Sequence, residues 1–462
     1  MDDTIAAIAT PFGSGGIGVI RISGPKAFDI ASTLFSRRKN RSEGFTGLES
    51  HRVYDGYIFD SKNRDIRDEV LLIPMKGPCS YTAEDVVEIQ AHAGPIVLRT
   101  ILDEILTQGA RLSEPGEFTK RAFLNQRIDL TQAEAVADII NAKSVSALKF
   151  AASQNLGALK RQIQELREKL IQFLALIEVN IDFPDDVEPF EPSQTEIELV
   201  DDVLEKCREF IRQHEDACFL KEGIRITICG APNVGKSSLM NRLLEQDRSI
   251  VTAIPGTTRD PIEEGLNIEG IPFVIIDTAG IHQTDDLVEI IGIEKAKDHI
   301  TAADLVLFLK EPGTHFTDRE FEKVVSVENQ LGKKVIFVIN KIDLNEGNLP
   351  ELSEKYQHIP KIEISALLNK GIIELKQKIV NICIARLDMG KSSVIPNLRH
   401  KKALEQAVEN LMFVKTGLKQ SQEEEILAID IKNSIDSLGT ITGETASLDI
   451  LDSIFNNFCI GK

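Results

Sequence analysis

The chain has 462 residues, enough for about three domains of ordinary size. Hydrophobic residues make up 42% and charged residues 27%, a composition that excludes an intrinsically disordered protein. Lys and Arg number 53 against 72 Asp and Glu, a net charge of −19, so any nucleic acid must be held by a local patch or through a second protein.

The six cysteines are scattered without CxxC pairs or neighbouring histidine pairs, which favours free thiols over a zinc site or a disulfide framework. The sequence starts Met-Asp-Asp without a basic or Arg-rich leader, and no run reaches about 18 apolar residues. We therefore expect a cytoplasmic protein that is neither secreted, imported nor membrane-spanning.

Residues 1–120 contain short apolar runs separated by glycine and proline, a pattern typical of a mixed α+β domain. The runs are Ile5 to Ala9, Val19 to Ile22, Val70 to Ile73 and Val86 to Ile89. We predict an N-terminal α+β domain over residues 1–120.

The segment Gly13 to Gly18 matches the dinucleotide-binding pattern G-x-G-x-x-G. That fold needs a helix after the glycines and an acidic residue about 20 positions later. Here the strand-like run Val19 to Ile22 follows, and residues 37–39 are basic. We interpret the segment as a tight glycine-rich loop between strands.

Helical patterns cover residues 121–220 and return over residues 381–462. Thr131 and Glu134 have the spacing of a capping box at a helix start. Apolar residues then step by three and four in a heptad-like seam at Leu156, Leu159, Ile163, Leu166, Leu170, Phe173 and Ile177. We predict an all-α helical domain in two parts, 121–220 and 381–462, with a different domain inserted between them.

Residues 221–380 alternate strands, glycine-rich loops and helices, which indicates a doubly wound α/β domain. The predicted strands are Ile224 to Cys229, Phe273 to Ile276, Leu305 to Leu309, Val335 to Ile339 and Ile362 to Ile364.

Two motifs of this domain point to bound phosphates. Residues 230–237 read G-x-x-x-x-G-K-S after the first strand. Main-chain N–H groups of such a loop surround the phosphates, Lys236 neutralises the β and γ oxygens, and the Ser237 hydroxyl ligates Mg²⁺. Asp277 to Gly280 ends the second strand, where an acid can hold the metal through water and the Gly280 N–H can meet the γ-phosphate.

Two further motifs point to guanine. Asp343, in the sequence Asn-Lys-Ile-Asp, can accept hydrogen bonds from guanine N1–H and the 2-amino group, neither of which adenine offers. The sequence Ser365-Ala366-Leu367 follows the last strand and can supply a main-chain donor to guanine O6. Four motifs in this order predict a GTP site in an inserted Ras-like P-loop GTPase domain.

The glutamine that orients the attacking water in Ras-type enzymes is absent. Its position, directly after Asp277 to Gly280, holds Ile281. We therefore expect hydrolysis to use polar groups from elsewhere.

The whole chain resembles the MnmE (TrmE) family of tRNA modification GTPases. In the GTPase domain the resemblance rests on Asn233, on residues 252–260 (TAIPGTTRD) and on residues 289–294 (EIIGIE) after Asp277 to Gly280. Outside it, residues 9–24 (ATPFGSGGIGVIRISG), 115–119 (PGEFT), 121–125 (RAFLN) and 459–462 (CIGK) match the family.

The resemblance implies a cytoplasmic enzyme that hydrolyses GTP and works with an FAD-dependent, NADH-using partner similar to MnmG. The two would form a heterotetramer and add an aminomethyl or carboxymethylaminomethyl group to carbon 5 of the wobble uridine of certain tRNAs. A tetrahydrofolate derivative, 5-formyl- or methylene-tetrahydrofolate, would be the one-carbon donor. Family members dimerise through the N-terminal domain, which binds the folate, and their GTPase domains pair when GTP and K⁺ bind.

By the same resemblance, Mg²⁺ would bind to Ser237 and Thr258, and K⁺ to Asn233, Thr252, Ile254 and Thr257. Glu289 would position the attacking water, although the residues alone favour a solvated helix residue there. The alternative for Asn233 is a residue that caps the loop. The full GTP-binding set would be Asn233, Val234, Gly235, Lys236, Ser237, Ser238, Thr252, Ala253, Ile254, Pro255, Gly256, Thr257, Thr258, Asp277, Thr278, Ala279, Gly280, Asn340, Lys341, Asp343, Ser365, Ala366 and Leu367.

For the folate, the resemblance implies Arg21, Glu88, Arg127 and Lys462. A carboxylate suits the donor edge of a pterin, and basic groups suit the glutamate tail. Arg21 could equally form a structural ion pair.

Cys459 would be a second catalytic residue, as a nucleophile or acid. The alternatives are a buried small hydrophobe and, since it follows the predicted helical run Leu448 to Phe458, a thiol whose pKa the helix dipole raises.

Two other functions fit the same motifs. One is a ribosome-assembly GTPase that acts as a regulatory switch, and the other is a folate-binding scaffold with a vestigial GTPase. The N-terminal domain and the C-terminal Cys-Ile-Gly-Lys favour the tRNA modification enzyme.

Overall fold

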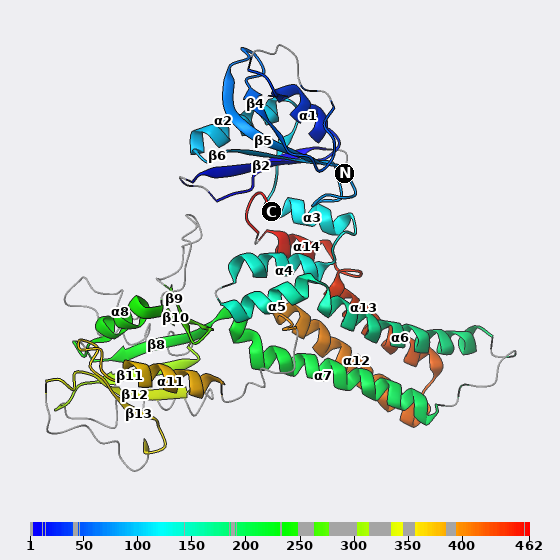
Figure 1. The fold of residues 1–462 in the computed structure, drawn as a ribbon. Helices are drawn as coiled ribbons and strands as arrows, with labels where there is room; N and C mark the ends of the chain where they lie inside the picture. The colour runs from blue at the N-terminus through cyan, green and yellow to red at the C-terminus, as the bar shows by residue number, and fades with distance from the viewer. Residues whose placement is uncertain are drawn as a thin grey trace, which may run out of the picture. The chain divides into compact units, whose positions relative to one another are not determined.

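The computed structural model describes residues 3–11, 13, 15–39, 45, 47–142, 144–183, 185, 190, 192–231, 233–247, 263–276, 303–313, 334–344, 356–384, 394–456 and 458–462. These residues form two compact units, whose elements are drawn in Figure 1. The first unit consists of Met1–Ala137, Gln154–Glu205 and Ala403–Lys462, and the second of Asp138–Ser153 and Lys206–Lys402. Both units are therefore discontinuous in sequence. The predicted boundaries at residues 120, 220 and 380 stay a prediction.

The elements before the second sheet are β1 Ile5–Ile8, β2 Ile17–Ser23, α1 Ala27–Leu34, β3 Phe35–Ser36, β4 Tyr54–Phe59, β5 Ile66–Met75, β6 Val86–His92, α2 Pro95–Thr107, β7 Arg111–Leu112, α3 Glu117–Leu124, α4 Leu130–Asn141, α5 Val145–Asn155, α6 Ala158–Asp182 and α7 Gln194–Glu222. The remaining elements are β8 Ile224–Gly230, α8 Lys236–Asp247, β9 Glu263–Ile268, β10 Ile271–Ile276, β11 Leu305–Lys310, β12 Lys334–Ile339, β13 Lys361–Glu363, α11 Ile372–Ile384, α12 Leu398–Gln420, α13 Glu424–Thr442 and α14 Leu448–Phe455.

The first unit contains a seven-stranded sheet in the order β3-β4-β5-β6-β2-β1-β7. Its neighbouring strands are antiparallel except for β1 and β7, which are parallel. The glycine-rich segment leads into β2 and not into a helix, which confirms that it is no dinucleotide-binding loop.

Both faces of β1 are buried, because successive side chains of a strand point to opposite faces. Ala6 and Ile8 join the core that α1 and α2 form over the sheet. Ile5 and Ala7 pack on the other face against Phe118 of α3. This packing explains the uninterrupted apolar run in the sequence and places α3 directly on the sheet.

Helix α4 begins earlier than predicted. Asp129 is its cap: Oδ1 accepts from Thr131 N–H at 2.7 Å and from Gln132 N–H at 3.1 Å, while Gln132 Oε1 accepts from Asp129 N–H at 3.1 Å. The reciprocal pair is a capping box. The prediction that placed the box at Thr131 and Glu134 is wrong by two residues, because Thr131 lies inside the helix.

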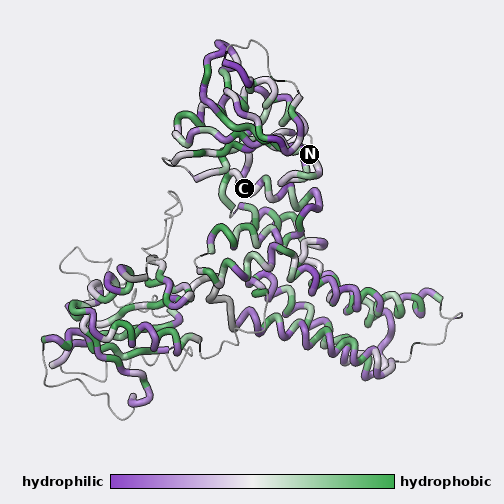
Figure 2. The backbone as a smooth tube through the Cα atoms, viewed as in Figure 1, coloured by the Kyte–Doolittle hydropathy of each residue, from purple (hydrophilic) through white to green (hydrophobic). Residues whose placement is uncertain are grey.

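Helix α6 buries the predicted seam from Leu159 to Ile177, which confirms the helical period. Figure 2 shows hydrophobic and hydrophilic residues alternating along this helix. Leu156, the first predicted member, is 75% exposed because it precedes the helix, which starts after the left-handed Gly157. Its assignment to the seam is wrong.

The second unit contains a six-stranded sheet in the order β13-β12-β11-β8-β10-β9. All pairs are parallel except β10 and β9. Helices α8 and α11 supply core residues on one face, and Tyr356 and Ile359 pack on the other. The strand order reverses on the two sides of β8, where doubly wound sheets bind ligands.

The predicted strands of this sheet are confirmed to within two residues at each end. The antiparallel edge strand β9 was not predicted, because residues 263–268 read as a polar segment with a central glycine. Among the helices of the described residues, none has a stretch long and apolar enough to cross a membrane.

Candidate functional site

The predicted phosphate loop connects β8 to α8 at the strand-order reversal of the second unit. Asn233 and Gly235 have positive φ values of 64° and 94°, which fold the loop tightly. A Cβ atom on Gly235 would lie 2.3 Å from Asn340 Nδ2, so this position requires glycine. Ser237 and Ser238 follow in the exposed first turn of α8.

Lys236 bends back over this loop. Its Nζ donates to the carbonyl oxygens of Gly230 at 3.0 Å and Ala231 at 2.9 Å. An ammonium held by carbonyl groups stays inside the loop, where phosphate oxygens would be stronger acceptors for it. The Lys236 ammonium is therefore already positioned to bind a phosphate.

Asn340 joins the phosphate loop to residues 365–367, which are predicted to contact guanine O6 and are called the base-reading loop here. It is 2% exposed, its Nδ2 donates to the Val234 carbonyl oxygen at 2.9 Å, and its Oδ1 accepts from the Ala366 N–H at 3.0 Å. Predicted as a nucleotide contact, Asn340 has its side-chain bonds inside the protein. Its role in the structure is to hold two loops in register.

The side chains of Lys341 and Asp343, which follow Asn340, have different surroundings. Lys341 has a positive φ of 65°, and its Nζ forms a 2.7 Å ion pair with Glu311 Oε2. Asp343 is exposed, and its carboxylate accepts no hydrogen bond within the part of the chain that the structure describes. A fixed turn with an open carboxylate is what reading the N1–H and 2-amino groups of guanine requires.

In the first unit, Arg21 and Glu88 face each other across β2 and β6. They are register partners, and Arg21 Nη2 lies 2.8 Å from Glu88 Oε1. Their side chains are 14% and 21% exposed, so the pair is shielded but reachable. The ion pair that the sequence left open for Arg21 is therefore present in the structure.

Tyr81, which the sequence analysis missed, links Arg127 to this pair. The guanidinium carbon of Arg21 lies 4.9 Å from the Tyr81 ring centroid, and that of Arg127 lies 5.2 Å away. Arg127 Nη1 also donates to the Tyr81 carbonyl oxygen at 2.9 Å, and the Tyr81 hydroxyl bonds with Thr119 Oγ1 at 2.9 Å. One aromatic ring therefore makes cation–π contacts with two arginines.

Residues 459–462, named the tail here, dock on the start of α3. Gly116 N–H donates to the Cys459 carbonyl oxygen at 3.4 Å, and Phe118 N–H donates to the main-chain oxygen of Lys462 at 3.1 Å. Arg21 Nη1 adds a 3.4 Å bond to the Gly461 carbonyl oxygen. In Figure 1 the C-terminus lies beside α3.

Gly461 is the closest point of contact. Its φ is 92°, and a Cβ atom there would lie 2.4 Å from the Ile8 carbonyl oxygen. No other residue type fits both the backbone conformation and the space.

The tail brings two predicted residues to the Arg21–Glu88 pair. Burial lowers the pKa of Lys462, and the Arg21 charge adds to this, while Cys459 and Glu88 act in the opposite direction. Four of the predicted residues therefore lie within electrostatic reach of one another. The structure places Arg127 at the same site through Tyr81.

Cys459 is exposed, so the alternative of a buried small hydrophobe is wrong. Burial instead raises the pKa of Cys207 and Cys229 to about 12. Helix α14 ends at Phe455, three residues earlier than predicted, which weakens the helix-dipole argument because that effect fades within a turn. Chemically, Cys459 is one of two exposed thiols among the described cysteines, Cys79 being the other.

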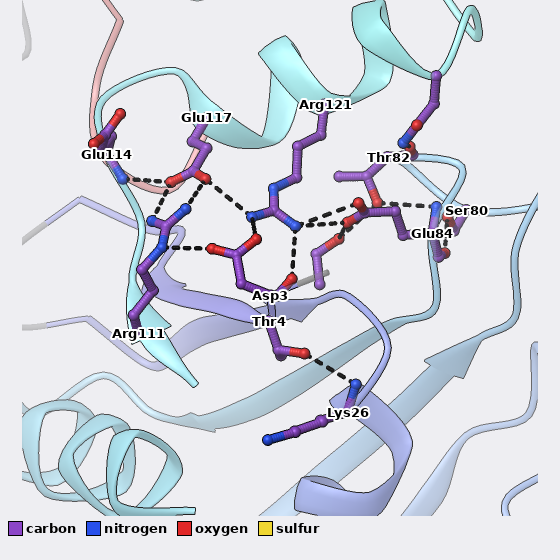
Figure 3. Close-up of polar contacts among 12 residues, drawn as sticks. Asp3, Thr4, Lys26, Ser80, Thr82, Glu84, Arg111, Glu114, Glu117 and Arg121 are labelled. Atoms are coloured by element: carbon purple, nitrogen blue, oxygen red, sulfur yellow. Dashed lines mark hydrogen bonds and ion pairs between the residues drawn. The ribbon is translucent and has the colours of Figure 1, made fainter. Parts of the chain in front are cut away.

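A buried charge network holds α3 where the tail docks. Figure 3 shows the Arg121 guanidinium among three carboxylates: Asp3 at 2.8 Å, Glu117 at 3.0 Å and Glu84 at 3.1 Å. Arg121 is fully buried, and Arg111 makes a second contact with Glu117. The network connects the start of β1, the loop before β6 and α3.

Comparisons with known proteins cover the whole chain. A family model described as GTP-binding protein TrmE N-terminus matches residues 4–127, and one described as MnmE helical domain matches residues 130–459. A tRNA modification GTPase MnmE from Clostridioides difficile is 45% identical over 464 residues, with 100% of each chain covered. The chain belongs to the MnmE family of tRNA modification GTPases.

Another MnmE relative, from Carboxydothermus hydrogenoformans, is 44% identical over 469 residues and also covers 100% of each chain. Among solved structures, a variant of Era from Aquifex aeolicus bound to GDP.AlF4- is 30% identical. That match covers 41% of this chain and 66% of the other, with a TM-score of 0.28, which adds nothing to the assignment. The family and the GTPase class predicted from the sequence are confirmed.

Several predicted residues of this MnmE-family chain lie outside the described residues. They are residues 252–258, residues 277–280, Ile281 and Glu289. The metal ligands Thr252, Ile254, Thr257 and Thr258 are among them, so the structure describes only Ser237 and Asn233 of the predicted Mg²⁺ and K⁺ sites.

Proposed function

We propose that this chain is a cytoplasmic enzyme that couples GTP hydrolysis to modification of the wobble uridine of tRNA. In this proposal it works with an FAD-dependent partner similar to MnmG and adds an aminomethyl or carboxymethylaminomethyl group to carbon 5 of the base. The observation that carries the proposal is the docking of the tail beside the Arg21–Glu88 pair, since it brings an exposed thiol to a cluster of charged groups.

The charged cluster fits a folate. Glu88 can accept hydrogen bonds from the donor edge of a pterin, and Arg21, Arg127 and Lys462 can bind the carboxylates of the glutamate tail. Tyr81 adds an aromatic face that already carries both arginines. A bound 5-formyl- or methylene-tetrahydrofolate would supply the one-carbon unit.

Cys459, placed by the tail, would act as nucleophile or acid toward the uridine. A lowered pKa makes Lys462 easier to deprotonate than an ordinary lysine, so it can exchange a proton with a neighbouring group at lower pH. The tail therefore combines a thiol and an amine of lowered pKa at the proposed folate site.

For GTP, the fold supports Lys236 at the phosphates and Asp343 at the base, held by Asn340. Mg²⁺ would bind to Ser237 and Thr258. Glu289 would position the attacking water, in place of the glutamine that is absent at Ile281.

K⁺ would bind to Asn233, Thr252, Ile254 and Thr257. A monovalent cation beside the transferred phosphoryl group supplies the positive charge that an arginine finger supplies elsewhere. In the proposal the chain forms a homodimer through its N-terminal domain, and this dimer forms a heterotetramer with the partner.

Nucleoside analysis of bulk tRNA tests the proposal. We expect cells that carry only the Cys459→Ser variant to lose the modified wobble uridine, whereas purified variant protein keeps near-normal GTPase activity. Cys79→Ser is the matched control, since Cys79 is also exposed but is not part of the tail.

Full modification by Cys459→Ser would make the thiol structural. If cells without the protein show unchanged nucleosides together with defects in ribosomal subunits, the chain is an assembly switch and the proposal is wrong.

A further inference from the structure

A side chain of α8 contacts the loop that is proposed to read guanine O6. Arg242 donates from Nε to the Ala366 carbonyl oxygen at 3.1 Å and from Nη2 to the Leu367 carbonyl oxygen at 3.3 Å. The Arg242 side chain is 29% exposed, so both bonds are partly shielded from water. Because α8 begins at Lys236, one helix spans from the phosphate loop to the base-reading loop.

One main-chain N–H group of this loop, that of Leu367, is available to a ligand. Leu367 is 75% exposed, and within the described part of the chain its N–H has no acceptor. The neighbouring donors are paired, Ser365 N–H with Lys370 O at 3.0 Å, Ala366 N–H with Asn340 Oδ1 at 3.0 Å, and Leu368 N–H with Ser365 Oγ at 3.1 Å. The Leu367 N–H is therefore the donor of this loop that a ligand can use.

Arg242 controls the direction of that donor. The Ala366 carbonyl and the Leu367 N–H belong to one peptide group, which is planar and trans, so the two bonds point in opposite directions. A hydrogen bond from Arg242 to the carbonyl on one side of the loop therefore holds the N–H toward the other side.

We propose that Arg242 is a positioning residue for base specificity, which aims the Leu367 N–H at O6 of guanine. The proposal rests on the proposed GTP site, in which Asp343 reads the N1–H and the 2-amino group. Because the two residues serve different groups of the base, nucleotide analogues separate their effects.

The test compares nucleotide affinities of Arg242→Ala and the unchanged protein by competition titration. GDP and IDP both carry O6, whereas 2-aminopurine riboside diphosphate lacks it. We expect Arg242→Ala to weaken GDP and IDP equally, by about 3- to 10-fold, the range for one hydrogen bond, and to leave the 2-aminopurine nucleotide unchanged. Glu245→Gln removes the other partner of Arg242, a 2.9 Å ion pair on the exposed side, and should change none of the three affinities.

A second measurement uses the unchanged full-length protein. Hydrogen exchange at the Leu367 amide should slow when GDP binds and should not slow with the 2-aminopurine nucleotide. Equal loss of all three affinities in Arg242→Ala, or no protection of Leu367 by GDP, would overturn the proposal. A failure of the GTP site itself shows differently: Asp343→Asn would keep its preference for GDP over XDP.

Discussion

Asn340 Nδ2 donates a 2.9 Å hydrogen bond to the carbonyl oxygen of Val234. The amide thereby joins the loop that carries Lys236 to the strand end that carries Asp343, two segments more than 100 residues apart in sequence. Both polar groups of this buried amide are hydrogen-bonded, and the loss of either bond would cost free energy. Phosphate and base recognition therefore depend on one side chain that need not touch the nucleotide.

Base specificity should change with Asp343→Asn. The variant replaces an acceptor-only carboxylate by an amide, which can donate to the O2 of xanthine but no longer accepts two guanine donors. We expect the preference to shift from GTP to XTP by about 10²-fold or more. Competition titration with the two nucleotides measures the shift, and retained GTP preference would remove Asp343 from this role.

Docking of the tail should depend on Gly461. In Gly461→Ala a Cβ atom would be forced to within 2.4 Å of the Ile8 carbonyl oxygen, at a φ of 92° that side chains avoid. We expect loss of folate binding and of uridine modification, with GTP turnover unchanged. Gly47→Ala is the matched control, because Gly47 has a similar φ of 98° but open space around it. If both variants bind folate equally well, the tail does not form the site.

The sequence predicts local features of this fold better than contacts between distant segments. The strands β11 and β12 consist almost entirely of a continuous apolar run, so their positions can be read from the sequence alone. The start of α4 was misplaced because Asp129 and Thr131 are both good caps, and only the hydrogen bonds decide between them.

Two contacts were beyond sequence reasoning. The burial of Arg121 needs carboxylates from Asp3, Glu84 and Glu117, which only the folded chain brings together. Arg242 reads as an ordinary charged residue of a helix surface, and its contact with Ala366 spans 124 residues. Both side chains contact residues that are distant in the sequence, so no local motif indicates these contacts.

The Arg121 network should make the first unit sensitive to acid. Burial raises the pKa of Glu117, but hydrogen bonds from Arg111, from the Glu114 N–H and from Arg121 outweigh this and leave the pKa below 4.5. A carboxylate with a lowered folded-state pKa stabilises the protein above its unfolded pKa, and this stability is lost as the pH falls through the folded-state value.

We therefore expect the thermal stability of the full chain to fall below about pH 4.5. Glu117→Gln should destabilise the unit by about 3 kcal/mol at pH 7, since it leaves the buried Arg121 short of a partner, and should flatten the acid dependence. Calorimetry across the pH range measures both effects. Asp55→Asn is the control, because the Asp55 ion pair with Arg37 is exposed. An unchanged acid profile in Glu117→Gln would mean that the network does not control acid stability.

The last prediction concerns the cation, because Ile281 and the absent arginine finger leave hydrolysis without water orientation and without positive charge at the phosphoryl group. If the left-handed Asn233 and residues 252–258 bind K⁺, replacing K⁺ by the smaller Na⁺ should lower kcat strongly and leave nucleotide affinity nearly unchanged, since the cation acts on the transition state.

Glu289→Ala should lower kcat by about 10²- to 10⁴-fold without weakening GTP binding, the usual range for a positioned acid or base. Both effects should require two GTPase domains to meet, so the turnover per molecule of an isolated 221–380 fragment, which lacks the N-terminal dimerisation domain, should rise with its concentration. Steady-state kinetics in matched KCl and NaCl buffers decide the question: equal turnover in the two salts, at a rate independent of concentration, would show that this domain hydrolyses GTP by another route.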